Sequence, residues 1–190
     1  MSRNTKTAQL VAFTLFLICL VSVGSAQQPA RAPLALGAEP DKFAALAFLS
    51  GTWTATPDAD SAKRLGIVAG QPSGVFTFLP ELNGQVLVRR NIRGAVRNQA
   101  YARDDVLYIY FESGALRAIY FDTEGHVIHY SVSTAADSAV FLSDVAAPGP
   151  RFRLSYHLNG ESLDGLFEVA APGSADFHPY LHWTSTKAKK

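Results

Sequence analysis

Residues 48–54, FLSGTWT, decide the fold that this sequence predicts. Before them, Phe43, Leu46 and Leu49 fall on one face at helical spacing, and a serine and a glycine end that pattern. After Gly51, small and β-branched residues flank Trp53, which favours a strand. The stretch therefore predicts a short helix that passes through a glycine into the first strand of a β-rich domain, with Gly51 and Trp53 in structural roles.

Short strands are expected at close spacing through the rest of the chain. They cover residues 52–56, 75–79, 85–92, 106–112, 115–122, 127–134, 139–144, 151–158, 163–169 and 180–185. Turn-forming pairs such as Asn83-Gly84 and Asn159-Gly160 separate them. About ten strands with short turns predict an all-β, up-and-down antiparallel barrel, because closure leaves no exposed edge. A two-sheet sandwich is the alternative. The polar segment 57–74 is expected to form a lid over one end.

The N-terminus has the pattern of an export signal. Arg3 and Lys6 precede an apolar run at 10–23, and small residues up to Ala26 provide a cleavage site. We expect a signal peptide at 1–26, a flexible tether at 27–40 and one domain at 41–187, in a secreted or periplasmic protein. An uncleaved membrane anchor is the alternative.

Cysteine and charge content exclude several functions for the mature chain. The single cysteine, Cys19, lies in the leader, so cleavage would remove the thiol needed for a disulfide, a cysteine zinc site or a cysteine nucleophile. Cleavage would also leave 15 basic side chains against 16 acidic ones. This balance predicts neither a nucleic-acid partner nor stable attachment to a membrane.

The motif at 48–53 resembles the start of calycin-type barrels, namely the lipocalins with their Gly-x-Trp and, more closely, the nitrobindin-like barrels. The run from Ala118 to Tyr130 is similar to secreted bacterial lipocalin-like proteins. The resemblance spans the mature domain and implies a cavity for a small apolar or amphipathic ligand. In nitrobindin-like barrels it further implies haem, held by a histidine of a His-Leu pair on the last strand. The matching pair here is Tyr180-Leu181, flanked by His178 and His182.

Spacing argues against histidine metal sites. His126 and His129 point to opposite faces of a strand, and about 13 Å of extended chain separates His178 from His182. The sequence has no Gly-x-Ser-x-Gly elbow, His-Glu-x-x-His pair or phosphate-binding loop. We therefore assign no metal ligand and no catalytic residue.

Alternation along the strands predicts which side chains face the lumen. The apolar set of the strand at 151–158 is Phe152, Leu154, Tyr156 and Leu158. Basic and polar residues alternate with this set, so it is expected to face inward. A four-residue turn at 123–126 would pair Phe121 with Ile128 and place Arg117 and Tyr130 on the inward face.

The strand at 85–92 also divides into two faces. Its more apolar face consists of Val86, Val88, Arg90 and Ile92. We therefore expect Arg90 inside the barrel with Arg117, where the two guanidinium groups would bind the acidic head of a ligand. The apolar part would contact Phe76, Phe78, Tyr130 and Tyr156. The alternative is a strand bulge that turns an arginine to solvent, or a structural pairing with a carboxylate.

Three functional classes remain open at this point. The first is a binding protein for a small hydrophobic or amphipathic molecule, and the second is an isomerase or cyclase that uses the same cavity. The third is a structural or interaction module with a filled lumen. Barrel closure would also pair the first strand with the last, so Trp53 is expected near Leu181 and Trp183, where it would seal one end.

Overall fold

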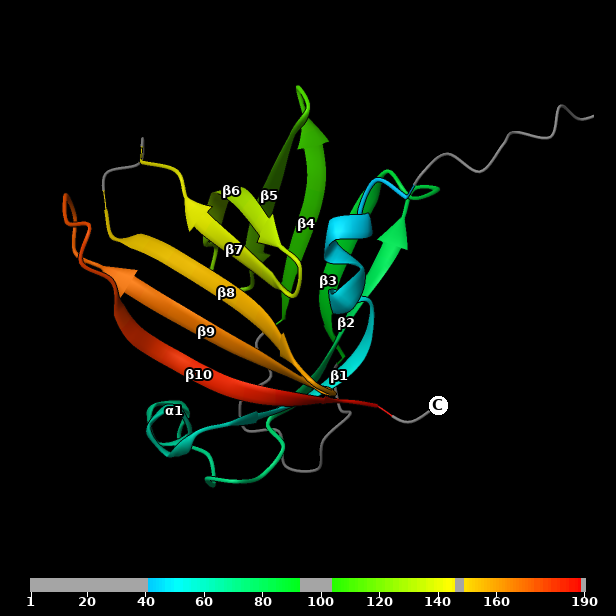
Figure 1. Ribbon diagram of the computed structural model, residues 1–190. Helices are drawn as coiled ribbons and strands as arrows, with labels where there is room; N and C mark the ends of the chain where they lie inside the picture. Colours follow the sequence, from blue (N-terminus) through cyan, green and yellow to red (C-terminus); the bar gives the residue numbers. More distant parts are fainter. Residues whose placement is uncertain (1–40, 93–103, 146–148, 189–190) are drawn as a thin grey trace, which may run out of the picture. The chain divides into compact units, whose positions relative to one another are not determined.

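The computed structural model describes residues 41–92, 104–145 and 149–188, which form a closed barrel of antiparallel strands (Figure 1). Each strand pairs with the next one along the chain, and β1 pairs with β10. The strands are β1 (Gly51–Pro57), β2 (Gly74–Glu81), β3 (Val86–Ile92), β4 (Asp105–Glu112), β5 (Ala115–Asp122), β6 (Val127–Ala135), β7 (Ser138–Ser143), β8 (Arg151–Asn159), β9 (Ser162–Ala170) and β10 (His178–Lys187). The predicted up-and-down barrel is confirmed, and its closure excludes the sandwich.

The expected signal peptide at 1–26, with Cys19, and the expected tether at 27–40 lie outside the described residues. Within the described part of the chain, no helix has the length and apolar character needed to cross a membrane.

One end of the barrel carries the short helix that the sequence predicts, as the 3-10 helix η1 (Ala44–Leu49). Trp53 Nε1 donates a hydrogen bond to the Leu49 carbonyl oxygen at 2.7 Å, which ties η1 to β1. Gly51 has a φ of 120°, and a Cβ at this position would lie 3.0 Å from Lys187 Cε. A side chain is disfavoured here both by the backbone conformation and by this contact.

Residues of η1, β1 and β2 fill this η1 end of the barrel. Leu46, Leu49, Trp53 and Phe78 are all almost fully buried. Trp53 lies opposite Lys187 in the β1–β10 register, and the Lys187 ammonium is 5.2 Å from the centroid of the indole ring. Trp183 lies opposite Pro57 instead. The expected pairing of first and last strands is therefore confirmed, but the expected proximity of Trp53 to Leu181 and Trp183 is wrong.

The opposite end carries helix α1 (Ala59–Leu65), which lies beside β10 in Figure 1. The Asp58 side chain caps α1 by accepting a hydrogen bond from Ser61 N at 2.8 Å, and Gly66 ends it in a left-handed conformation. The Ser61 hydroxyl accepts a hydrogen bond from His182 N at 2.7 Å, which docks the helix on β10. The polar lid expected at 57–74 therefore contains a helix that the sequence analysis missed, although both capping residues signal it.

The register between β2 and β3 corrects the expected orientation of Arg90. Arg89 lies opposite Phe78, and Asn91 lies opposite Phe76. Because directly opposed residues of antiparallel strands share a face, Arg89 and Asn91 point into the barrel with the two phenylalanines. Arg90 points outward, where its guanidinium contacts the Glu81 carboxylate at 3.1 Å and the Tyr108 hydroxyl at 3.2 Å.

The register between β5 and β6 corrects the expected orientation of Arg117. Phe121 pairs with Val127 rather than with Ile128, a shift of one residue that reverses the faces of one strand relative to the other. Ala118 therefore shares the inward face with Tyr130. Arg117 lies outside the barrel and forms an ion pair with Asp144.

Candidate functional site

The α1 end of the barrel contains a cavity of about 580 Å³. Its apolar lining comes from the inward faces of the strands and includes Phe76, Leu107, Ile128, Phe152, Leu154 and Phe167. Side chains of α1, of the β5–β6 turn and of the first half of β10 surround its mouth. The interior of the barrel is therefore filled by packed side chains at the η1 end and contains a cavity at the α1 end.

A group of polar residues lies on the inward faces of β3, β4, β6 and β8, and we refer to it as the lumen cluster. Its members are Arg89, Asn91, Asp105, Tyr130 and Tyr156, all of which line the cavity. Of these five residues, only the two tyrosines were predicted from the sequence to belong to the site.

An ion pair between Arg89 and Asp105 is the centre of the lumen cluster. Their side chains are 13% and 12% exposed, and Arg89 Nη1 donates a hydrogen bond to Asp105 Oδ1. Asn91 links the two charges, because its Nδ2 donates to Asp105 Oδ2 at 2.9 Å and its Oδ1 accepts from Arg89 Nη2 at 3.2 Å. Burial disfavours the guanidinium cation, but the adjacent Asp105 carboxylate outweighs this cost and raises the pKa of Arg89. Arg89 is therefore a fixed cation whose charge is neutralised inside the barrel.

The two tyrosines place phenol hydroxyls next to this ion pair. Burial raises the pKa of Tyr130, and neighbouring Tyr156 and Asp105 raise it further. Burial also raises the pKa of Tyr156. The nearby Arg89 cation lowers this pKa, but by less than burial raises it. Both phenols are protonated at neutral pH, so each has a proton to donate to a ligand. Among the residues that the structure describes, none forms a hydrogen bond with the Tyr130 hydroxyl.

Aromatic rings hold Tyr156 in place. Its ring centroid lies 5.4 Å from that of Phe78 and 6.0 Å from that of Trp183, both in edge-to-face geometry. Trp183 in turn packs over the backbone of Gly165, where an added Cβ would lie 2.2 Å from the indole ring. Trp183, which was expected to have a structural role near Trp53, is therefore a wall of the cavity.

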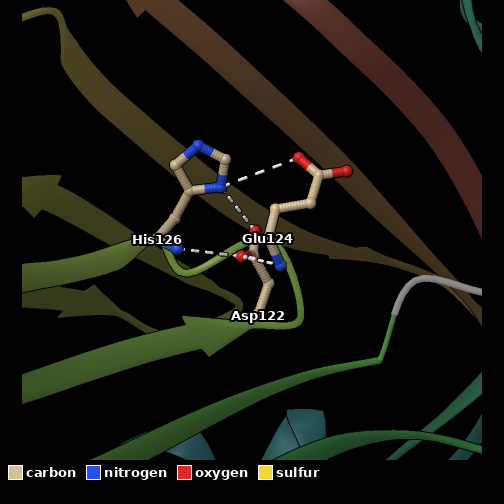
Figure 2. A group of neighbouring side chains, drawn as sticks. All are labelled: Asp122, Glu124 and His126. Atoms are coloured by element: carbon tan, nitrogen blue, oxygen red, sulfur yellow. Dashed lines mark hydrogen bonds and ion pairs between the residues drawn. The ribbon is translucent and has the colours of Figure 1, made fainter.

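The β5–β6 turn forms one side of the mouth (Figure 2). Asp122 Oδ1 accepts hydrogen bonds from the backbone N–H groups of Glu124 and His126, and its Oδ2 lies 2.9 Å from His126 Nδ1. Burial raises the pKa of Asp122, but these hydrogen bonds outweigh that effect, and the net result is a lowered pKa. Figure 2 shows the imidazole with Nδ1 directed at both carboxylates.

One ligand atom from each of Asp122, Glu124 and His126 lies within 4.8 Å of the others. Carboxylate oxygens and imidazole nitrogens are of the right chemical type for a divalent cation. Asp122, however, already holds the turn together through two backbone N–H groups and the imidazole. Stabilisation of the β5–β6 turn accounts for this arrangement. The sequence prediction considered His126 only as a possible metal ligand together with His129, and not its contact with Asp122 in its own turn.

The last strand forms the other side of the mouth. His182 Nδ1 lies 3.2 Å from Asp58 Oδ2, next to the N-terminus of α1. Tyr180 is half-exposed at a bulge in β10, with its ring centroid 6.2 Å from that of Phe167 and 5.5 Å from the Arg64 guanidinium. Both side chains line the cavity, whereas His178 is exposed outside it.

The structure thus divides the residues that the sequence analysis proposed for ligand binding. Phe76, Tyr130 and Tyr156 line the cavity, and Phe78 is buried behind Tyr156. Arg90 and Arg117 form ion pairs on the outer surface. The inward-facing cation is instead Arg89, and two signals for it were the alternation of Leu87, Arg89 and Asn91 and the acidic start of the following strand.

No protein-family model matches this chain, and no curated protein sequence matches it. The class of protein is therefore defined by the structure alone. It is a closed, ten-stranded antiparallel β-barrel of calycin-like architecture, with one end filled and a cavity at the other.

Proposed function

We propose that this protein binds a small hydrophobic or amphipathic molecule inside the barrel. The observation that supports this proposal is the cavity of about 580 Å³ at the α1 end. Ligand sites in proteins commonly measure roughly 300–1,000 Å³ and combine apolar walls with a few convergent polar groups. Here the walls are aromatic and aliphatic side chains, and the lumen cluster supplies the polar groups.

Two further parts of the proposal rest on sequence. The pattern at 1–26 supports export, so we propose that the mature protein begins at Gln27 and binds its ligand outside the cytoplasm. The motif that ends in Trp53 supports kinship with lipocalins or nitrobindin-like barrels. Mass spectrometry of the protein exported by cells that express the full chain tests the first part, because cleavage elsewhere or none at all would contradict it.

An uncharged fluorescent probe, N-phenyl-1-naphthylamine, tests the binding function. The probe is expected to bind the wild type with enhanced emission, and Leu154→Trp is expected to weaken its binding at least about tenfold by filling the cavity. Leu154 lines the cavity and is 9% exposed, so the larger ring has adjacent space and we expect a stability cost of at most about 1–3 kcal/mol.

Val127→Trp is the matched control, because Val127 lies on the outer surface of β6 and is 54% exposed. The same ring added there is expected to leave probe affinity unchanged. Equal affinity of the wild type and Leu154→Trp would show that the probe binds elsewhere. Absence of saturable binding to the wild type, or to any of a set of apolar probes, would contradict the proposed function.

Haem is a second candidate ligand, favoured by the contact between His182 and Asp58. A carboxylate on Nδ1 fixes the imidazole and leaves Nε2 as the iron ligand, an arrangement common among metal-binding histidines. Half-exposed Tyr180 is the other side chain of the mouth that fits an iron ligand. When bound, the iron would supply the capacity to coordinate a small gaseous or anionic ligand.

Titration with hemin tests this candidate. Haem binding predicts a saturable, stoichiometric Soret shift that His182→Ala abolishes and Tyr180→Phe leaves in place. His178→Ala is the control, because this exposed histidine lies outside the cavity. A shift that persists in His182→Ala and disappears in Tyr180→Phe would assign the tyrosine as the ligand, and no saturable shift would exclude haem.

A further inference from the structure

The charge inside the barrel restricts the kind of ligand that the cavity accepts. Arg89 is the cation of the lumen cluster and Asp105 is its anion, and a direct hydrogen bond joins them. Asn91 uses its amide nitrogen on Asp105 and its amide oxygen on Arg89. The cluster therefore has no net charge, and each of its two charged side chains has an ion-pair partner, although Arg89 Nε is buried without a hydrogen bond in the described part of the chain.

The Tyr130 hydroxyl is a lumen-cluster group that remains available to a ligand. Tyr130 is 2% exposed and lines the cavity, and no other residue in the described parts of the chain shares a hydrogen bond with its hydroxyl. A ligand that covered this hydroxyl without accepting its proton would leave the hydroxyl unpaired, which is costly, so a ligand with an acceptor oxygen at this position is favoured. Tyr156, which is 1% exposed, places a second phenol beside it. In the described part of the chain, the lumen-cluster donors that a ligand can reach are therefore phenol hydroxyls, because the unpartnered Arg89 Nε is fully buried.

The described side chains at the mouth supply no excess of positive charge for an acidic ligand. Within residues 41–92, 104–145 and 149–188, the charged side chains at the mouth that line the cavity are Arg64, Asp122 and Glu124. With the neutral Arg89–Asp105 pair they give two guanidinium groups against three carboxylates, histidines aside. A carboxylate placed beside Tyr130 would lose its hydration next to a guanidinium that Asp105 already neutralises, because Arg64 lies at the mouth and not in the lumen cluster.

We propose that the ligand is an uncharged amphiphile, an apolar chain or ring system with a hydroxyl or carbonyl oxygen that accepts a hydrogen bond from Tyr130. This inference rests on the proposed binding function and narrows it. It also replaces the acidic head group expected from Arg90 and Arg117, since both of these guanidinium groups lie outside the barrel.

Competition by three probes with the same alkyl chain tests the inference: decanol, decanoate and decylammonium, each displacing N-phenyl-1-naphthylamine from the full chain. Decanol is expected to bind at least about tenfold more tightly than either ion. Tighter binding of decanoate or of decylammonium would overturn the inference while leaving the binding function intact. Failure of every apolar probe to bind would instead contradict the binding function itself.

Charge variants of the lumen cluster give shifts of opposite sign. Asp105→Asn leaves Arg89 unneutralised and is expected to raise the affinity for decanoate relative to decanol at least about tenfold. Arg89→Gln leaves Asp105 unneutralised and is expected to favour decylammonium by a similar factor. The double variant Arg89→Gln/Asp105→Asn restores neutrality, so its preference for decanol is expected to match the wild type. Unchanged ratios in both single variants would overturn the inference.

Tyr130→Phe tests the hydrogen bond without changing the charge. The variant is expected to bind decanol about threefold to tenfold more weakly, the effect of one hydrogen bond, and to bind decane as the wild type does. Tyr108→Phe is the matched control, because the Tyr108 hydroxyl contacts Arg90 on the outer surface. An equal loss of decane and decanol binding in Tyr130→Phe would show that the phenol acts only through packing, and would overturn its assigned role.

Discussion

The two ends of this barrel are built from the same strands and differ in what those strands direct inward. Toward η1, the inward positions carry side chains such as Trp53, Phe78 and Leu163, which are almost fully buried in one hydrophobic cluster. Toward α1, the inward positions of β3 and β4 carry Arg89 and Asp105. A polar cluster must keep its hydrogen-bond geometry and does not interdigitate as an apolar core does, so space remains beside it.

This difference shows how one fold combines stability with a binding site. The filled end gains stability from apolar burial and supports the closed sheet, whereas buried charges at the other end contribute little stability for the cost of removing them from water. Local departures from good packing are typical of functional sites. Substitutions at the two ends are therefore expected to separate stability from binding.

The largest expected effect follows removal of the main side chain of the filled end. Trp53→Ala deletes an indole ring that is 1% exposed and breaks its hydrogen bond to Leu49. We expect a loss of about 3–5 kcal/mol in the free energy of unfolding, measured by urea denaturation. Probe affinity of the remaining folded protein is expected to stay within about twofold of the wild type. Loss of binding without loss of stability would show that the roles of the two ends are reversed.

A matched pair of leucine truncations compares the two ends directly. Leu163 is fully buried near the η1 end, whereas Leu154 lines the cavity. Leu163→Ala is expected to cost about 3–5 kcal/mol because it creates a new cavity, and Leu154→Ala about 2–3 kcal/mol because it enlarges an existing one. Urea denaturation gives both values. Equal costs would indicate that the α1 end is packed as tightly as the η1 end.

The smallest expected effect concerns the turn at the mouth. The lowered pKa of Asp122 means that its ionised form stabilises the folded protein, fully above the ordinary carboxyl pKa of 3.8 and less as the pH falls through the folded-state value. Asp122→Asn is therefore expected to cost about 1 kcal/mol at pH 7, with a smaller difference near pH 3. Urea denaturation at both pH values measures this difference.

Asp137→Asn provides the control for that comparison. Asp137 lies in the β6–β7 turn at the η1 end, and in the described part of the chain its carboxylate has no hydrogen-bond partner. Because no hydrogen bond of the side chain is lost, its substitution is expected to change the free energy of unfolding at pH 7 by less than about 0.5 kcal/mol. A difference between the wild type and Asp122→Asn that grows toward low pH would contradict the sign assigned to the Asp122 carboxylate.

The strands and their turns were predictable because their signals are local. Period-two alternation and turn residues such as Asn83-Gly84 place the strands at nearly their observed bounds. The same alternation correctly places Phe152, Leu154 and Tyr156 inside, because no inward position of β8 carries a charge. Helix α1 was equally local in its signal, through Asp58 and Gly66, and was missed because the segment is short and polar.

Which faces of β3 and β5 point into the barrel could not be predicted from the alternation of apolar and polar residues. The more apolar face of β3 was expected inside, but Asp105 from β4 gives Arg89 a partner in the lumen, which local sequence does not show. For β5, a turn that differs by one residue from the expected one reverses the faces. As a result, Arg90 and Arg117 were both predicted inside the barrel, whereas the structure places them outside.

The sequence by itself determined that the chain forms antiparallel strands, that a glycine and Trp53 join η1 to β1, and that the first strand pairs with the last. Only the tertiary structure decided which arginine lies inside, where the cavity lies and that Asp105 neutralises the buried Arg89. The physical reason is the separation along the chain of the residues that interact. Strand propensity and turn chemistry act between near neighbours in the chain, whereas a buried charge is tolerated only when a residue from another strand neutralises it.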